Sequence, residues 1–243
     1  INVFTEDGKI NENAPKEFIG LDRFEARKQL LKKLKENNFF VEEENIKNKV
    51  PYGDRSNSII EPYLTEQWFA DAKKLSIKAK EIVNNKSTNF FPENWSKTYF
   101  QWMDNIEPWC VSRQLWWGHQ IPAWYGPDGK VFVEYTEEEA IKEAKNYYKK
   151  DVELKRDEDV LDTWFSSGLW PFATLGWPNQ TDYLKKFYPT TVLVTGFDII
   201  FFWVARMMMM GMAFLEKEPF KDIYVHALVR DEKGQKMSKS KGN

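Results

Sequence analysis

The stretch that decides the fold is residues 191–215, TVLVTGFDIIFFWVARMMMMGMAFL. Its first part, Thr191 to Thr195, is a short apolar and β-branched run that predicts a buried strand. Gly196 permits close approach to the backbone, and Asp198 stands where the following helix starts. We therefore predict that Thr195, Gly196 and Asp198 form a ribose-binding corner at the carboxyl edge of a parallel sheet. In the alternative, Asp198 is only the N-cap of the helix.

The apolar segment that follows is also the one candidate for a membrane span. Ile199 to Leu215 is apolar except for Arg206. It is shorter than the roughly 20 residues that a span requires, and it carries a charge at its middle. We therefore predict a buried helix, in which Met207 to Met210 pack in the core.

Further apolar runs on both sides of this stretch predict an α/β fold. Strands are expected at Trp109 to Ser112 and at Asp222 to Val229, and helices after Thr65 and after Pro92. Apolar strands that alternate with helices favour a parallel sheet covered on both faces, as in Rossmann-like domains.

Two smaller regions interrupt or precede this pattern. Residues 1–60 predict a small α+β unit, with a helix from Asp22 to Glu36 and short strands at Phe39 to Val41 and Ser58 to Ile60. An insertion near residues 125–155 begins with a glycine-rich hairpin turn and continues with a helix. The start of this helix carries a capping box of Thr136 and Glu139.

Composition sets limits on the class of protein. The 243 residues are 42% hydrophobic and 30% charged, with a net charge of −2, so any contact with nucleic acid must come from local basic patches. Cys110 is the only cysteine, which excludes an internal disulfide framework and a zinc site made of several thiolates. We expect a reducing, cytoplasmic compartment. The chain does not open with Met, and we expect it to be a piece of a longer protein.

The sequence Lys236-Met237-Ser238-Lys239-Ser240 is the most specific motif. A chance match to these five residues has a probability on the order of one in ten thousand. Ammonium groups of Lys236 and Lys239 on a glycine-hinged loop can meet phosphate oxygens, and the Ser238 hydroxyl can donate to them. When a carboxylate attacks the α-phosphate of ATP, such lysines stabilise the charge that builds up on the phosphates. The alternative is a solvated basic turn without a ligand.

This motif is the second signature of the class I aminoacyl-tRNA synthetases, which the chain resembles along essentially its whole length. Three further segments resemble the valine-specific members in particular: WCVSRQLWWGH (109–119), DVLDTWFSSG (159–168) and TGFDIIFFW (195–203). The resemblance implies that residues 61–243 are the second half of the Rossmann-like catalytic domain. Residues 1–60 would then be the C-terminal part of the editing domain.

The resemblance also implies roles for individual residues. Trp164, Ile199 and Trp203 would be walls of the valine pocket, Ile199 and Trp203 being four residues apart on one helix and so on one face. Lys239 would contact the ATP phosphates, and Asp198 the ribose. The substrates would be valine, ATP with Mg²⁺, and tRNA(Val), with no protein-bound zinc, no membrane and a monomeric full-length enzyme.

The valine-specific enzymes are themselves a well-known illustration that such a pocket cannot reject threonine, so the resemblance implies hydrolysis of mischarged threonyl-tRNA by the full-length enzyme. The main editing residues are expected before Ile1. The first class I signature, His-x-Gly-His, is absent from the chain, whose two histidines are His119 and His226. This polypeptide alone is therefore expected to be inactive. The alternatives are an isoleucyl- or leucyl-tRNA synthetase, and a non-catalytic RNA-binding relic of the fold.

Overall fold

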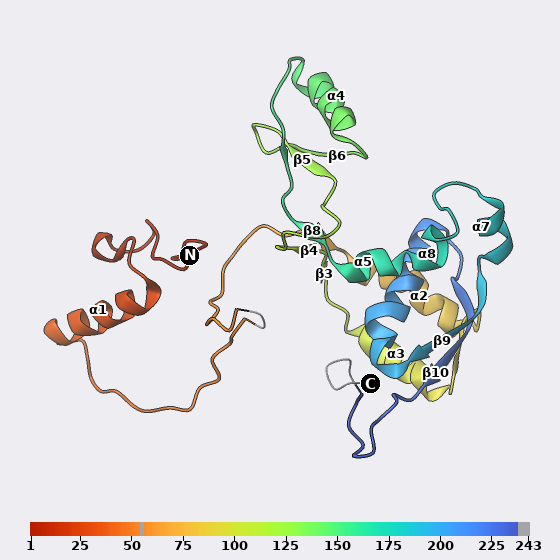
Figure 1. The fold of residues 1–243 in the computed structure, drawn as a ribbon, viewed down its shortest axis with the longest axis horizontal. Helices are drawn as coiled ribbons and strands as arrows, with labels where there is room; N and C mark the ends of the chain where they lie inside the picture. The colour runs from red at the N-terminus through yellow and green to blue at the C-terminus, as the bar shows by residue number, and fades with distance from the viewer. Residues whose placement is uncertain (54–55, 238–243) are drawn as a thin grey trace. The chain divides into compact units, whose positions relative to one another are not determined.

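A computed structural model describes residues 1–53 and 56–237, and Ser238, Lys239 and Ser240 of the basic motif lie outside this part of the chain. The chain divides into two compact units, Ile1–Glu66 and Gln67–Asn243 (Figure 1). Both helices and strands are present, so the predicted α/β class is confirmed.

The first unit is built around one helix. A short 3₁₀ helix, η1 (Lys16–Phe18), precedes α1 (Arg23–Glu36), and Asp22 caps α1 by accepting a hydrogen bond from the Phe24 amide at 2.8 Å. A small core of Ile10, Phe18 and Ala26 holds these elements together.

The two strands predicted in this unit are wrong. Residues 39–41 have no regular structure, and Ile59 forms only an isolated bridge with Tyr52. Phe39 and Val41 are 75% and 92% exposed. Their β propensity has no neighbouring strand to pair with among the described residues, and an unpaired strand is not stable in water.

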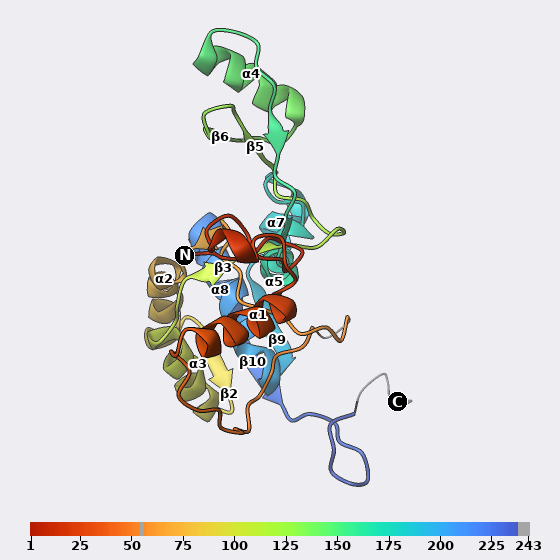
Figure 2. The same cartoon turned by 90° about the vertical axis from the view of Figure 1, so that its left-hand side faces the viewer.

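The second unit contains a three-stranded parallel sheet in the order β2-β10-β9 (Figure 2). The strands are β2 (Asn89–Phe91), β9 (Thr190–Gly196) and β10 (Phe220–His226). The register pairs Gly196 with His226, so the carboxyl ends of β9 and β10 lie side by side. Two of the three strands match the predicted ones. The third, β2, is too short for its sequence pattern to indicate a strand.

The predicted strand at Trp109 to Ser112 does not join this sheet. It is divided into β3 (Trp109–Cys110), which pairs antiparallel with β1 (Phe69–Ala70), and β4 (Ser112–Arg113), which pairs antiparallel with β8 (Val160–Leu161). The apolar character of this run comes from packing of Trp109 and Val111 against the core rather than from a place in the parallel sheet.

Helices cover one face of the parallel sheet. The inward residues Leu193, Ile223 and Val225 are buried in a core shared with α2 (Ala72–Asn84), α3 (Asn94–Asp104) and α8 (Arg206–Phe214). On the opposite face, Val192, Val194 and Tyr224 are 43%, 64% and 54% exposed. The expectation of a sheet covered on both faces is therefore wrong for the described part of the chain.

The helix after β9 is irregular at its start. A 3₁₀ turn, η2 (Phe197–Ile199), leads into the π-helical segment η3 (Ile200–Ala205), and α8 follows. Met207 to Met210 are buried, as predicted. By length and composition Phe197–Phe214 would suffice to cross a membrane, but half of it is buried within the protein, as in the core helices of many proteins.

Other helices complete the second unit. The helix predicted after Thr65 begins only at Ala72, where Asp71 caps it by accepting from the Lys74 amide. Three short helices run between β8 and β9: α5 (Thr163–Gly168), α6 (Trp170–Ala173) and α7 (Asp182–Phe187).

The predicted insertion leaves this body at β4 and returns at β8 (Figure 1). It consists of β5 (Ala123–Tyr125), β6 (Val131–Val133), α4 (Glu137–Tyr148) and β7 (Lys155–Arg156), in the sheet order β6-β5-β7. The Thr136 side chain accepts from the Glu139 amide, as the capping pattern predicts. A separate core of Trp124, Phe132, Ala140 and Ala144 stabilises it.

Candidate active site

The carboxyl end of β9 forms a narrow corner. Thr195 is buried, and Gly196 follows it as the last residue of the strand. A β-carbon at Gly196 would lie 2.8 Å from Asp198 Oδ1 and 3.7 Å from His226 Cε1, so the small residue is needed for the carboxylate to lie close to the strand end. The requirement comes from this close approach, since the backbone of Gly196 is ordinary extended chain.

Asp198 forms an ion pair with the first lysine of the basic motif. Lys236 Nζ lies 2.7 Å from Asp198 Oδ2, and the two side chains are 60% and 30% exposed. The structure thus brings together two features that the sequence indicated separately, the strand-end carboxylate and the lysine loop. Both groups remain open to solvent, so a ligand can reach either of them.

A tight turn places Lys236 at this corner. Asp231 Oδ1 accepts from the amides of Lys233 and Gln235, at 3.0 and 2.7 Å. Gly234 has a φ of +73°, in the left-handed region that glycine adopts most readily. The chain then returns, and Arg230 and Lys236 form an antiparallel bridge. Ser238 and Lys239, the other predicted catalytic residues, lie outside the described residues.

Two of the three predicted pocket residues, Trp164 in α5 and Trp203 in η3, lie where these two helices pack together, whereas Ile199 ends the turn η2 just before η3. Trp164 packs beside Phe202, with ring centroids 5.8 Å apart. Trp203 packs beside Trp170, and its Nε1 donates to the Ser167 carbonyl at 3.2 Å. All of these contacts join α5, or Trp170 just after it, to η3.

The argument that placed Ile199 and Trp203 on one helical face requires correction. It assumed α-helical spacing, but Ile199 ends the 3₁₀ turn η2 and Trp203 belongs to the π-helical η3. The number of residues per turn changes between them, so a separation of four residues does not by itself define a shared face. Both side chains are half-buried.

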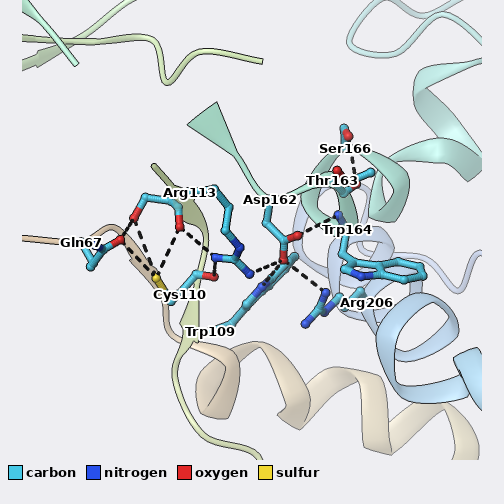
Figure 3. A network of polar contacts seen from close by, with 10 residues as sticks. Gln67, Trp109, Cys110, Arg113, Asp162, Thr163, Trp164, Ser166 and Arg206 are labelled. Atoms are coloured by element: carbon cyan, nitrogen blue, oxygen red, sulfur yellow. Dashed lines mark hydrogen bonds and ion pairs between the residues drawn. The ribbon is translucent and has the colours of Figure 1, made fainter. Parts of the chain in front are cut away.

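A buried polar cluster lies beside the pocket residues (Figure 3). Asp162, whose side chain is 8% exposed, accepts from Trp109 Nε1 at 3.0 Å and pairs with Arg113 at 3.1 Å and with Arg206 at 3.5 Å. The Arg206 guanidinium also lies 4.0 Å from the centre of the Trp109 ring. Burial lowers the pKa of Arg206, and the nearby Arg113 adds to this, whereas Asp162 opposes it.

Sequence reasoning missed this cluster. It noted Arg206 only as a charge that argues against a membrane span, and it gave Asp162 and Arg113 no role. The available signal was the charge itself, since an arginine inside an apolar helix needs a buried partner. The partner, 44 residues earlier in the chain, follows from no spacing rule.

Among the described residues, no three His, Cys, Asp or Glu side chains gather as a group that can hold a metal ion. The charged groups that the described residues bring to the candidate site are the Asp198 carboxylate and the Lys236 ammonium group. These suit a nucleotide and its phosphates.

A family model described as tRNA synthetases class I (I, L, M and V) matches residues 9–243, so the chain belongs to this family. Among its relatives, the valine–tRNA ligase of Pelagibacter ubique is 81% identical over all 243 residues, and that of Caulobacter vibrioides is 59% identical. The chain spans 28% and 27% of the length of these two proteins.

The fold is similar to that of Mycobacterium tuberculosis methionyl-tRNA synthetase, solved in complex with methionyl-adenylate. The TM-score is 0.53 at 16% sequence identity, over 80% of this chain and 32% of that one. At this identity the likeness concerns the fold alone.

Proposed function

We propose that this chain is a segment of a valine–tRNA ligase, in which residues 61–243 form the second half of the catalytic domain. In the full-length enzyme it would help to activate valine with ATP and to transfer it to tRNA(Val). The observation that carries the proposal is the meeting of Lys236 with Asp198 at the carboxyl end of β9. The choice of valine is supported by the 81% identity to a valine–tRNA ligase over the whole chain.

In the proposed reaction, a valine carboxylate oxygen forms a bond to the α-phosphorus of ATP, and the bond to the bridging oxygen of pyrophosphate breaks. Asp198 accepts hydrogen bonds from the ribose hydroxyls, while Thr195 and Gly196 shape the corner. Lys236, Lys239 and Ser238 stabilise the charge that grows on the departing phosphates. Mg²⁺ enters with ATP as part of the substrate. Lys236 must leave Asp198 before the ribose can occupy it.

The valine side chain is proposed to lie against Trp164, Ile199 and Trp203. Rigid indole and branched aliphatic walls would accept an isopropyl group and crowd the additional methylene of isoleucine. One methylene is worth about 1–3 kcal/mol of discrimination in an apolar pocket. The contact of Trp164, in α5, with Phe202 and the hydrogen bond from Trp203 to the Ser167 carbonyl of α5 support such a rigid wall.

The domain assignment belongs to the same proposal. Residues 61–243 would form half of a nucleotide-binding domain, with the insertion near 125–155, and residues 1–60 the end of an editing domain that removes threonine. The bare apolar face of the sheet, at Val194 and Tyr224, supports a half domain, because parallel sheets normally carry cover on both faces. The enzyme would act as a monomer in the cytoplasm.

The central test is Lys239→Ala in a full-length enzyme carrying this segment. We expect adenylate formation to slow by at least about tenfold, because one charge that stabilises the transition state is lost. Valine binding should stay nearly unchanged. Lys233→Ala, in the turn just before the motif, is the matched control and should leave the rate unchanged. An unchanged rate in Lys239→Ala would remove the assigned role.

A second test addresses the substrate and the alternatives. Pyrophosphate exchange with valine, isoleucine and leucine in the full-length enzyme should be fastest with valine. Faster exchange with isoleucine or leucine would favour one of the sister enzymes, and no exchange with any of the three would favour an RNA-binding relic. Residues 1–243 alone should be inactive, and valine-dependent exchange by this chain would contradict that expectation.

A further inference from the structure

We infer that Asp162 and Arg206 are positioning residues that set the width of the amino-acid pocket by holding Trp164 in place against the helix after β9. This inference rests on the proposed function. It gives a role to the buried cluster around Asp162, which takes no part in the proposed reaction (Figure 3). Neither residue is proposed to touch the substrate.

The two oxygens of Asp162 have separate partners. Oδ1 accepts from the backbone amide of Trp164 at 3.3 Å and so caps the first turn of α5. Oδ2 accepts from Trp109 Nε1 and faces both guanidinium groups. A single carboxylate therefore connects the backbone of a pocket residue to β3, β4 and α8.

The other end of α5 is also fixed. The Ser167 carbonyl accepts from Nε1 of Trp203, another residue of the proposed pocket. At Gly168, a β-carbon would lie 3.6 Å from Arg206 Cβ and 3.5 Å from Met210 Cγ, so α5 runs close to α8 there. The helix α5 is thus held at both ends. At the end that carries Trp164 it is held by Asp162, so the distance between Trp164 and η3 depends on the ion pair of Asp162 with Arg206.

Charge makes this link sensitive to substitution. The cluster contains one carboxylate and two guanidinium groups, so it holds one surplus positive charge. Arg206 is 8% exposed and stacks on Trp109, whereas the side chain of Arg113 is 40% exposed and also donates to the Cys110 and Ser112 carbonyls. Loss of the carboxylate would take away the ion-pair partner that holds Arg206 in place, so Arg206 would move even without Arg113. With Arg113 present, two like charges would also face each other, which lowers stability.

Movement of Arg206 and of the first turn of α5 would loosen Trp164. A pocket that excludes one methylene group by a rigid wall loses discrimination when the wall can shift by a fraction of a bond length. The measurable consequence is the ratio of kcat/KM for valine to kcat/KM for isoleucine. This ratio is independent of the fraction of enzyme that is folded, so a merely structural role does not change it.

The test uses Asp162→Asn in a full-length enzyme, for example one in which residues 1–243 replace the matching segment of the Pelagibacter ubique relative. Amino-acid activation is measured by pyrophosphate exchange. We expect the valine-to-isoleucine ratio to fall by at least about tenfold, the lower end of what one methylene is worth. Arg206→Lys, which keeps the charge but not the planar group, should lower the ratio less.

Two further variants protect the test against misfolding and supply a control. Asp162→Asn combined with Arg113→Gln returns the cluster to one surplus positive charge; it should regain thermal stability and keep the lowered ratio. Asp71→Asn is the matched control, because Asp71 also caps a core helix, where its side chain accepts from the Lys74 amide rather than from Trp164 or an arginine. It should leave the ratio unchanged.

Trp164→Ala separates this inference from the proposed function. If Trp164→Ala lowers the ratio and both Asp162 variants leave it unchanged, the inference is wrong and the pocket assignment stands. If Trp164→Ala itself leaves the ratio unchanged, the pocket assignment fails and the inference falls with it. A lowered ratio in Trp164→Ala and in both Asp162 variants, with Asp71→Asn unchanged, supports the inference.

Discussion

Asp162 and Asp198 are aspartates of the same domain that both pair with cations, yet their surroundings differ. The Asp162 side chain is 8% exposed and meets donors from four other residues. The Asp198 side chain is 30% exposed and pairs with one lysine, Lys236, whose side chain is 60% exposed. Buried carboxylates with several fixed partners hold a fold together, whereas an exposed carboxylate with one exchangeable partner can give that partner up to a ligand. The difference in burial therefore suggests a structural role for Asp162 and a ligand-binding role for Asp198.

The largest effect that this comparison predicts is on local stability at Asp162. Asp162→Ala should lower the opening free energy of α5 and α8 by about 3 kcal/mol, since it leaves buried guanidinium and indole donors without their acceptor. Amide hydrogen exchange of the full-length enzyme would measure it.

The control for this experiment is Asp71→Ala, which removes only an exposed cap and should cost about 1 kcal/mol at α2. If Asp162→Ala and Asp71→Ala destabilise their helices equally, the distinction between a buried and an exposed aspartate is wrong.

At Asp198 we expect the opposite pattern, with a small effect on stability and a larger effect on activity. Asp198→Ala should change stability by less than about 1 kcal/mol, because the ion pair is exposed. It should nevertheless raise the KM for ATP on the order of tenfold, by loss of a charged acceptor for the ribose. ATP-dependent pyrophosphate exchange measures the KM.

Lys236→Met sharpens the same experiment. In the proposed reaction Lys236 competes with the ribose for Asp198, so without it the KM for ATP should not rise, while the rate of adenylate formation should fall. If the KM for ATP rises in Lys236→Met and stays constant in Asp198→Ala, Lys236 rather than Asp198 contributes to ATP binding, and the proposed roles are wrong.

How far the sequence predicts this molecule depends on the range of the interactions. Local signals succeeded: the helix predicted from Asp22, the cap at Thr136 and the strand at Thr191 to Thr195 each depend on a few adjacent residues. The lysine motif and Asp198 were each predicted as site residues from their residue types, their places in the chain and the resemblance to the class I synthetases. Their contact needed the fold, because Lys236 lies 38 residues after Asp198.

The predictions that failed also have physical reasons, because they depend on contacts between distant parts of the chain. The strand β2 has three residues and takes its stability from β10 rather than from its own pattern. Phe39 has strand propensity but no partner strand in the described chain, and it is exposed. Asp162 contacts Trp109, 53 residues before it, and Arg206, 44 residues after it. A single sequence contains no rule that pairs residues so far apart.

The smallest prediction extends the comparison to a third, fully exposed carboxylate. In the insertion, the Tyr148 hydroxyl donates to Asp128, which lies in the turn between β5 and β6. This hydrogen bond lowers the pKa of Asp128. Partial burial, together with the Asp128 carboxylate, raises the pKa of Tyr148 to about 12.

The signs of these shifts define a pH window. The lowered pKa of Asp128 contributes stability that is complete above its unfolded value of about 3.9 and is lost as the pH falls through the folded value. The raised pKa of Tyr148 contributes stability that is complete below about 10 and is lost as the pH rises towards 12. The stability of the insertion should therefore be level between these limits and fall on both sides.

Tyr148→Phe tests this window, because it should flatten both edges at once, whereas Tyr135→Phe, an exposed tyrosine of the same insertion, should leave the profile unchanged. Carbon-13 labelling of the tyrosine rings allows the Tyr148 titration to be followed by NMR, with a midpoint expected near 12. A midpoint near 10 would mean that neither burial nor the Asp128 contact acts on the Tyr148 hydroxyl in solution. Because water competes with this exposed hydrogen bond, its loss should change stability less than the loss of the Lys236 pair, and far less than Asp162→Ala.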